Sequence, residues 1–166
     1  MNSILVAFGS MLSAPFVLCV LLGLPAMADD REKLLGNWKL VSFYTEDVET
    51  KQRNDVYGEH PIGYAALTAA GRLFAVITAN GRKPPNGSEE QAAAFRSMIA
   101  YTGKFRVESE KFITQVDTAW NEAWVGTEQV RVWRVDGDKL HITSAPIPNP
   151  NVPGGKMIGV LVWERD

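Results

Sequence analysis

The sequence predicts an all-β fold, an antiparallel up-and-down β-barrel of about eight strands with one helix between strands 3 and 4. Short alternating segments follow one another along residues 38–164, only one segment has a helical period, and no helix follows each strand as in an α/β fold. Two tryptophan motifs, at residues 36–38 and 163–165, stand at the two ends of this series, as expected if the first and last strands pair. A barrel closed in this way has an interior that can hold a small molecule.

The N-terminal segment has the pattern of an export signal. Residues 4–24 carry no charge and are mostly apolar, and they are followed by an Ala-Met-Ala cleavage site at 26–28 and then by polar residues. We therefore expect a signal peptide over residues 1–28, a barrel domain over 29–166, and export to the periplasm or out of the cell. The apolar run of about 20 residues is also near the length that spans a bilayer, so an uncleaved anchor stays open as an alternative.

Cysteine content and charge narrow the class of protein. Cys19 is the only cysteine and lies in the leader, so the barrel domain has no disulfide and no cysteine metal ligand. The formal net charge is −2 and no basic patch is visible, which argues against nucleic-acid binding. We expect no stable membrane insertion after removal of the leader, and the sequence leaves the oligomeric state open.

The individual elements follow from local patterns. Eight segments have the alternation and the branched or aromatic composition of strands: residues 38–45, 63–68, 72–78, 104–107, 112–118, 127–135, 139–143 and 157–164. Glycine-containing links at 69–71 and 136–138 predict hairpins. Ser88, followed by acidic residues, predicts a helix N-cap, with the helix running to about Ile99. The polar stretch 46–60 and the proline-rich stretch 145–155 predict loops.

Five segments taken in order resemble the lipocalin-like domain family and, more distantly, the lipocalins. They are residues 35–42, which contain the Gly-x-Trp pattern, and residues 61–74, 101–105, 124–131 with 136–140, and 162–165. The resemblance covers about residues 34–165 and implies a calycin-type barrel. In lipocalins the Gly-x-Trp tryptophan closes one end of the barrel beneath an arginine from near the end of the chain. The resemblance therefore implies that Trp38 and Arg165 form a structural closure through a cation–π contact.

The resemblance also marks one departure. Members of the family often carry histidine in the strand that corresponds to residues 112–118, whereas Gln115 stands near that place here. Histidine chemistry proposed for relatives is therefore not expected in this chain.

Strand 127–135 offers candidate ligand-binding residues, with two alternatives for the face that points inward. The first alternative places these side chains in the cavity: Ile113, Gln115, Asp117, Gln129, Arg131 and Trp133. An enclosed Arg131 then needs a carboxylate, either that of Asp117 or that of a ligand. The second alternative places Val130 and Val132 in the core and leaves Gln129 and Arg131 in water, which is the ordinary pattern of a half-buried strand.

Tyr101 and Trp124 complete the predicted site. Aromatic side chains at a cavity mouth can clamp an apolar ligand, and the alternative is that they simply cap the core. His60 and His141 are the only histidines, and neither has a second histidine at the spacing of a metal site. We therefore expect no metal site and no cofactor.

The sequence favours an exported binding protein over an enzyme. The expected ligand is a small, largely apolar molecule in the barrel cavity, with Arg131 facing an acidic head group if the ligand has one. One alternative is a small isomerase or cyclase that uses a cavity carboxylate, Asp117. Another is a structural or interaction protein whose barrel is filled by its own side chains.

Overall fold

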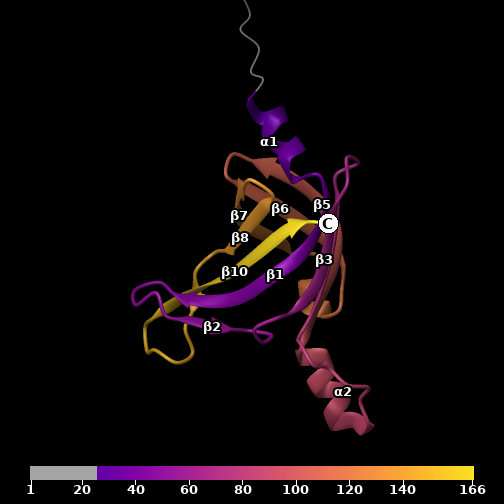
Figure 1. Ribbon diagram of the computed structural model, residues 1–166, viewed down its shortest axis with the longest axis vertical. Coiled ribbons are helices and arrows are strands. Elements are labelled where there is room, and N and C mark those ends of the chain that lie inside the picture. Colours follow the sequence, from indigo (N-terminus) through magenta and orange to yellow (C-terminus); the bar gives the residue numbers. More distant parts are fainter. Residues whose placement is uncertain (1–25) are drawn as a thin grey trace, which may run out of the picture.

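The computed structural model describes residues 26–166 (Figure 1). Its strands are β1 (Gly36–Asp47), β2 (Arg53–Asp55), β3 (Ile62–Leu67), β4 (Arg72–Thr78), β5 (Met98–Glu108), β6 (Lys111–Ala119), β7 (Glu128–Asp136), β8 (Lys139–Ser144), β9 (Ile147–Pro148) and β10 (Lys156–Arg165). Its helices are α1 (Ala26–Leu34), α2 (Gly87–Arg96) and the single 3₁₀ turn η1 (Glu122–Trp124). Most of the predicted signal peptide, residues 1–28, lies outside the described residues.

The predicted fold class is confirmed. Eight long strands form an antiparallel sheet in which each strand pairs with its neighbour, and the pairing of β1 with β10 closes the sheet into a barrel. That pairing begins at Trp38 opposite Arg165, so the two tryptophan motifs are neighbours as expected. Within residues 26–166, no helix is long and apolar enough to cross a membrane.

Three details differ from the sequence-based expectation. Residues 53–55 of the expected loop form the short strand β2 against β1, so the helix lies between β4 and β5 in the numbering of the structure. The helix begins at Gly87 with Asn86 as N-cap and ends at Arg96, because Met98 already pairs with Thr78 in the sheet. Helix α1 was not expected.

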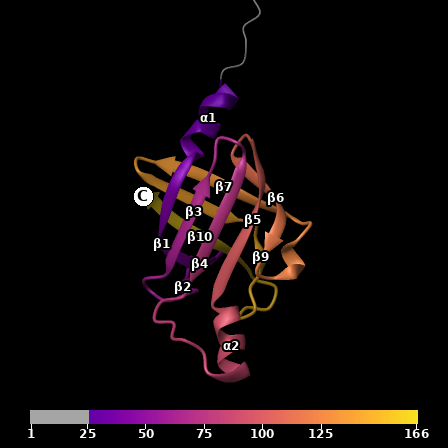
Figure 2. The same ribbon diagram turned by 90° about the vertical axis from the view of Figure 1, so that its right-hand side faces the viewer.

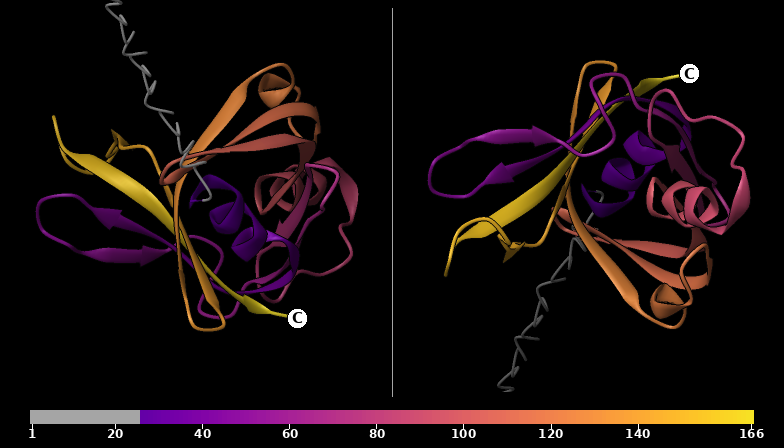
Figure 3. Two further views of the ribbon diagram at one scale, coloured as in Figure 1. Left: turned by 90° about the horizontal axis from the view of Figure 1, so that it is seen from above. Right: turned by 90° about the horizontal axis from the view of Figure 1, so that it is seen from below.

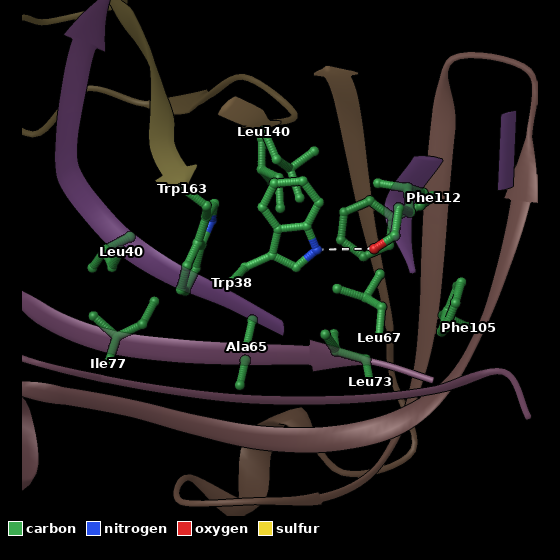
Figure 4. Close-up of a cluster of buried hydrophobic side chains, with 13 residues drawn as sticks. Trp38, Leu40, Ala65, Leu67, Leu73, Ile77, Phe105, Phe112, Leu140 and Trp163 are labelled. Atoms are coloured by element: carbon green, nitrogen blue, oxygen red, sulfur yellow. Dashed lines mark hydrogen bonds between the residues drawn. The ribbon is translucent and has the colours of Figure 1, made fainter. Parts of the chain in front are cut away.

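Trp38 lies at the centre of a sealed end of the barrel (Figure 4). Its ring is fully buried, and its Nε1–H donates to the carbonyl of Leu34 at 2.9 Å. The Cζ of Arg165 lies 4.3 Å from the centroid of the Trp38 ring, and the same guanidinium donates to the carbonyl oxygens of Leu35 and Lys33. The predicted contact of Arg165 with Trp38 is therefore present, and it also ties down the C-terminal end of α1.

Helices α1 and α2 lie at opposite ends of the barrel (Figure 2). Figure 3 shows the barrel along its length. Strand β2, the adjoining part of β1 and the start of β10 project from the barrel to one side. The cavity described below reaches the surface away from Trp38, since its lining includes Val56 and Ile147, which are both substantially exposed.

Candidate functional site

The barrel encloses a cavity of about 380 Å³. A volume of this size falls within the range of ligand pockets, roughly 300–1,000 Å³. Strand alternation gives the cavity an apolar wall, because every second side chain of a strand points inward. On β4, for example, Leu73, Ala75 and Ile77 are buried and line the cavity, whereas Phe74 and Val76 are about half exposed. The interior is therefore not filled by the protein's own side chains.

Strand β7 directs Gln129 and Arg131 into the cavity. Arg131 stands opposite Phe112 of β6 and Ser144 of β8 in the sheet register, and directly opposed side chains point to the same face. Phe112 is almost fully buried, so Arg131 shares its inward direction. The alternative that placed Val130 and Val132 in the core is wrong, since neither lines the cavity and Val132 is 43 % exposed.

Arg131 is a partly buried cation with few protein partners. Its Nη1 donates to the carbonyl of Val130 at 2.9 Å, and its Nη2 donates to Oε1 of Gln129 at 2.9 Å. Among the described residues, no carboxylate forms an ion pair with it. Burial lowers the pKa of Arg131, because the charged form loses hydration, while the neighbouring Tyr101 acts in the opposite direction.

Gln115 and Asp117 do not lie in the cavity, so their predicted place in it is corrected. Both are exposed, and the buried positions of β6 include Phe112, Thr114 and Val116 instead. The physical reason is that the larger apolar side chains take the inward positions and leave the amide and the carboxylate in water.

Each of these two outward residues has a partner on the surface. Gln115 donates from Nε2 to the carbonyl of Gly126 at 3.1 Å. Asp117 forms an ion pair with Arg72 at 2.8 Å, and the hydrogen bond from Arg72 lowers the pKa of the carboxyl more than any other contact. Of the two carboxylates considered as partners of Arg131, that of Asp117 is therefore ruled out, because it pairs with Arg72 on the surface.

Tyr101 and Trp124 lie together on the cavity wall. Their rings meet edge to face with 5.4 Å between centroids, and Trp124 makes a similar contact with Trp120 at 4.9 Å. The ring centroid of Trp120 in turn lies 6.4 Å from that of Phe95 in α2. This row of aromatic rings connects the cavity wall to the surface helix.

The hydroxyl of Tyr101 has no hydrogen-bond partner among the described residues. Burial raises the pKa of Tyr101, and the positive charge of Arg131 opposes that rise. The two side chains are thus close enough to interact electrostatically, and both face the same cavity.

Trp133 occupies a different place from the one expected. It lies on the same face of β7 as Arg131 but packs against the hydrophobic core and does not line the cavity. Its Nε1 is buried without a hydrogen-bond partner among the described residues.

Other cavity residues were missed by the sequence interpretation. They include Phe43, Ser144, Leu161 and Trp163. Alternation along β1, β8 and β10 could have identified them, but the positions of the inward faces depend on the strand register, and β1 contains an irregularity between Leu40 and Ser42.

Two further observations bear on the chemistry of the site. Within residues 26–166, no group of three or more His, Cys, Asp or Glu side chains is arranged to hold a metal ion. Among the described residues, no Asp or Glu lines the cavity, and Asp117 in particular does not, so the alternative of an enzyme that uses Asp117 as a cavity carboxylate has no support.

Comparison with known proteins agrees with the architecture. No curated protein matches the chain. The profile of a family described as a lipocalin-like domain matches residues 35–166, which span the barrel from its first strand to its last. The chain forms a closed eight-stranded sheet, and the family profile matches most of the chain's length. The chain therefore belongs to the lipocalin-like domain family.

Proposed function

We propose that this protein is an exported binding protein that holds a small, largely apolar molecule in the cavity of its barrel. An acidic group on that ligand would be oriented by Arg131. The single observation that supports the proposal is the cavity itself, about 380 Å³ of space lined mainly by aliphatic and aromatic side chains.

Burial of apolar ligand surface would supply most of the affinity. Removal of apolar area from water contributes about 25 cal/mol per Å² before the entropic cost of association. Side chains such as Leu73, Ile77 and Leu161 offer no hydrogen bonds, so an apolar ligand body loses nothing by contacting them.

The cavity can be tested by filling it. Ala75 is buried and lines the cavity, so Ala75→Phe would place a ring inside it. Ala66 on the adjoining strand does not line the cavity, so Ala66→Phe is a matched control. We expect the natural protein and Ala66→Phe to bind the neutral fluorophore N-phenyl-1-naphthylamine, and Ala75→Phe to bind it at least about tenfold more weakly.

Thermal unfolding of all three proteins would separate loss of the cavity from loss of the fold. Equal binding of the fluorophore by a well-folded Ala75→Phe would contradict the proposal. Native mass spectrometry of protein from its own host would show any retained ligand, and N-terminal sequencing would show whether the exported chain begins at Asp29.

A further inference from the structure

The charge lining the cavity is unbalanced. Arg131 is the only charged side chain among the described residues that line it, and the other polar contributors are neutral, including Thr45, Tyr101, Gln129 and Ser144. A cation enclosed by apolar walls is costly unless an anion or several acceptors face it. No described residue supplies an anion here, so the lining of the cavity carries a single uncompensated positive charge.

The guanidinium of Arg131 has donors to spare. A guanidinium has five N–H donors, and the hydrogen bonds to Val130 and Gln129 use two of them, which leaves three without a partner among the described residues. The bond to Gln129 also fixes the orientation of the group, since it joins side chains two positions apart on the same face of β7. The guanidinium is therefore held in place with unused donors.

The hydroxyl of Tyr101 adds a second donor near this cation. Tyr101 lines the same cavity as Arg131, and its hydroxyl has no hydrogen-bond partner among the described residues. The edge-to-face contact with Trp124 restricts the tyrosine ring. A planar fork of N–H groups beside an O–H group suits a carboxylate, which has two oxygens and accepts from both kinds of donor.

We propose that the cavity selects amphiphilic monocarboxylates, with the carboxylate bound by Arg131 and Tyr101 and the hydrocarbon part against the apolar wall. This inference rests on the proposed function and names the class of ligand. A second anionic group would lie among apolar side chains without a partner, so dicarboxylates are disfavoured. A saturated chain takes roughly 30 Å³ per water-sized methylene group, so the cavity has room for a chain of about a dozen non-hydrogen atoms, which is the size of decanoate.

The experiment compares ligands that differ only in their polar ends. Isothermal titration calorimetry near neutral pH would measure binding of decanoate, 1-decanol and decanedioate to the natural protein. Hydrogen bonds to a charged group typically change binding by about tenfold to a hundredfold. We expect decanoate to bind at least about tenfold more tightly than either of the other two.

Variants of Arg131 and Tyr101 would show whether these two residues cause the preference for decanoate. Arg131→Met keeps the apolar stem and is expected to weaken decanoate about tenfold to a hundredfold while changing 1-decanol less than about threefold. Tyr101→Phe removes only the hydroxyl and is expected to weaken decanoate about threefold to tenfold. Arg134→Met is the matched control, because Arg134 lies on the outer face of the same strand and pairs with Asp136.

The outcomes separate the inference from the proposed function. Equal affinity of the natural protein for decanoate and 1-decanol, with the neutral fluorophore still bound, overturns the carboxylate class alone. So does a preference for decanoate that survives in Arg131→Met. Failure of every probe, including the fluorophore, overturns both proposals. The comparison of ligands on the natural protein needs no variant, so it decides the question even if Arg131→Met does not fold.

Discussion

The guanidinium of Arg165 stacks on the indole of Trp38, with 4.3 Å between Cζ and the ring centroid, and joins the last strand of the barrel to the first. The same group donates to two carbonyl oxygens, those of Leu35 at 2.6 Å and Lys33 at 2.8 Å. One side chain thus holds three segments at the sealed end: β1, β10 and the C-terminus of α1.

Arg165→Ala should lower the free energy of unfolding by about 1–3 kcal/mol, because it removes a cation–π contact and two charge-assisted hydrogen bonds. Urea unfolding followed by tryptophan fluorescence would measure the change. Arg134→Ala, which removes only an exposed ion pair, should change stability by less than about 0.5 kcal/mol. Similar losses in the two variants would show that Arg165 has no special role.

Gly36→Ala should be destabilising for two separable reasons. Gly36 has a φ of +123°, and a Cβ at this position would lie 2.7 Å from Nη1 of Arg165. Gly81 also has a positive φ, +70°, but has open space around it, so Gly81→Ala reports backbone strain alone. We expect Gly36→Ala to cost at least about 1 kcal/mol more than Gly81→Ala in urea unfolding. Equal costs would mean that neither the larger φ nor the close approach of Arg165 adds strain at Gly36.

Asp47 should contribute to acid sensitivity. It accepts hydrogen bonds from the backbone N–H of Thr50 and Glu49 and from Nδ2 of Asn149, and the bond from Thr50 is the largest cause of its lowered pKa. Because the pKa is lower in the folded state than in the unfolded state, this stabilisation is present above the unfolded pKa, about 3.9, and is lost as pH falls through the folded pKa.

Urea midpoints measured between about pH 5 and pH 2 would test this effect. The midpoint of the natural protein should fall with pH, and Asp47→Asn should show a smaller fall, since its side chain does not titrate. Asp55→Asn, at an exposed position on β2, is the control for the removal of one carboxylate. An unchanged pH dependence in Asp47→Asn would contradict the assignment.

Trp124→Ala should weaken binding of an apolar fluorophore in the cavity by about tenfold, because it removes aromatic surface from the wall and the ring contact that restricts Tyr101. Val125 is the next residue, is 36 % exposed and does not line the cavity, so Val125→Ala should bind normally. A fluorescence titration of both variants would suffice. Unaltered affinity in Trp124→Ala would place the fluorophore elsewhere.

Sequence patterns predicted the barrel well because apolar and polar residues alternate within each long strand, so each of these strands can be recognised on its own. The contact between Trp38 and Arg165 was implied by the resemblance of the first and last strands to those of lipocalins, and the structure contains that contact. Short elements were harder, since β2 has only three residues and all of them are exposed. Helix α1 has no strong amphipathic pattern that could have marked it in advance.

The site was predicted only in part, because the set of side chains that points into the cavity depends on the inward face of two neighbouring strands. Gln129 and Arg131 point inward, as one of the two alternatives predicted. For residues 112–118 the wrong face was expected to point inward, so Gln115 and Asp117 were predicted in a cavity that they do not line. A shift of one residue exchanges the two faces of a strand. The apolar positions Phe112 and Val116 were the better guide to the inward face.

The antiparallel pairing of β1 with β10 also constrains the order in which the chain can fold. Residues 36–47 cannot find their partner strand until residues 156–165 have been synthesised, and contacts so distant along the chain form slowly. A chain that lacks residues 156–165 therefore leaves one edge of β1 without its partner strand, and the addition of the ten residues of β10 covers that edge.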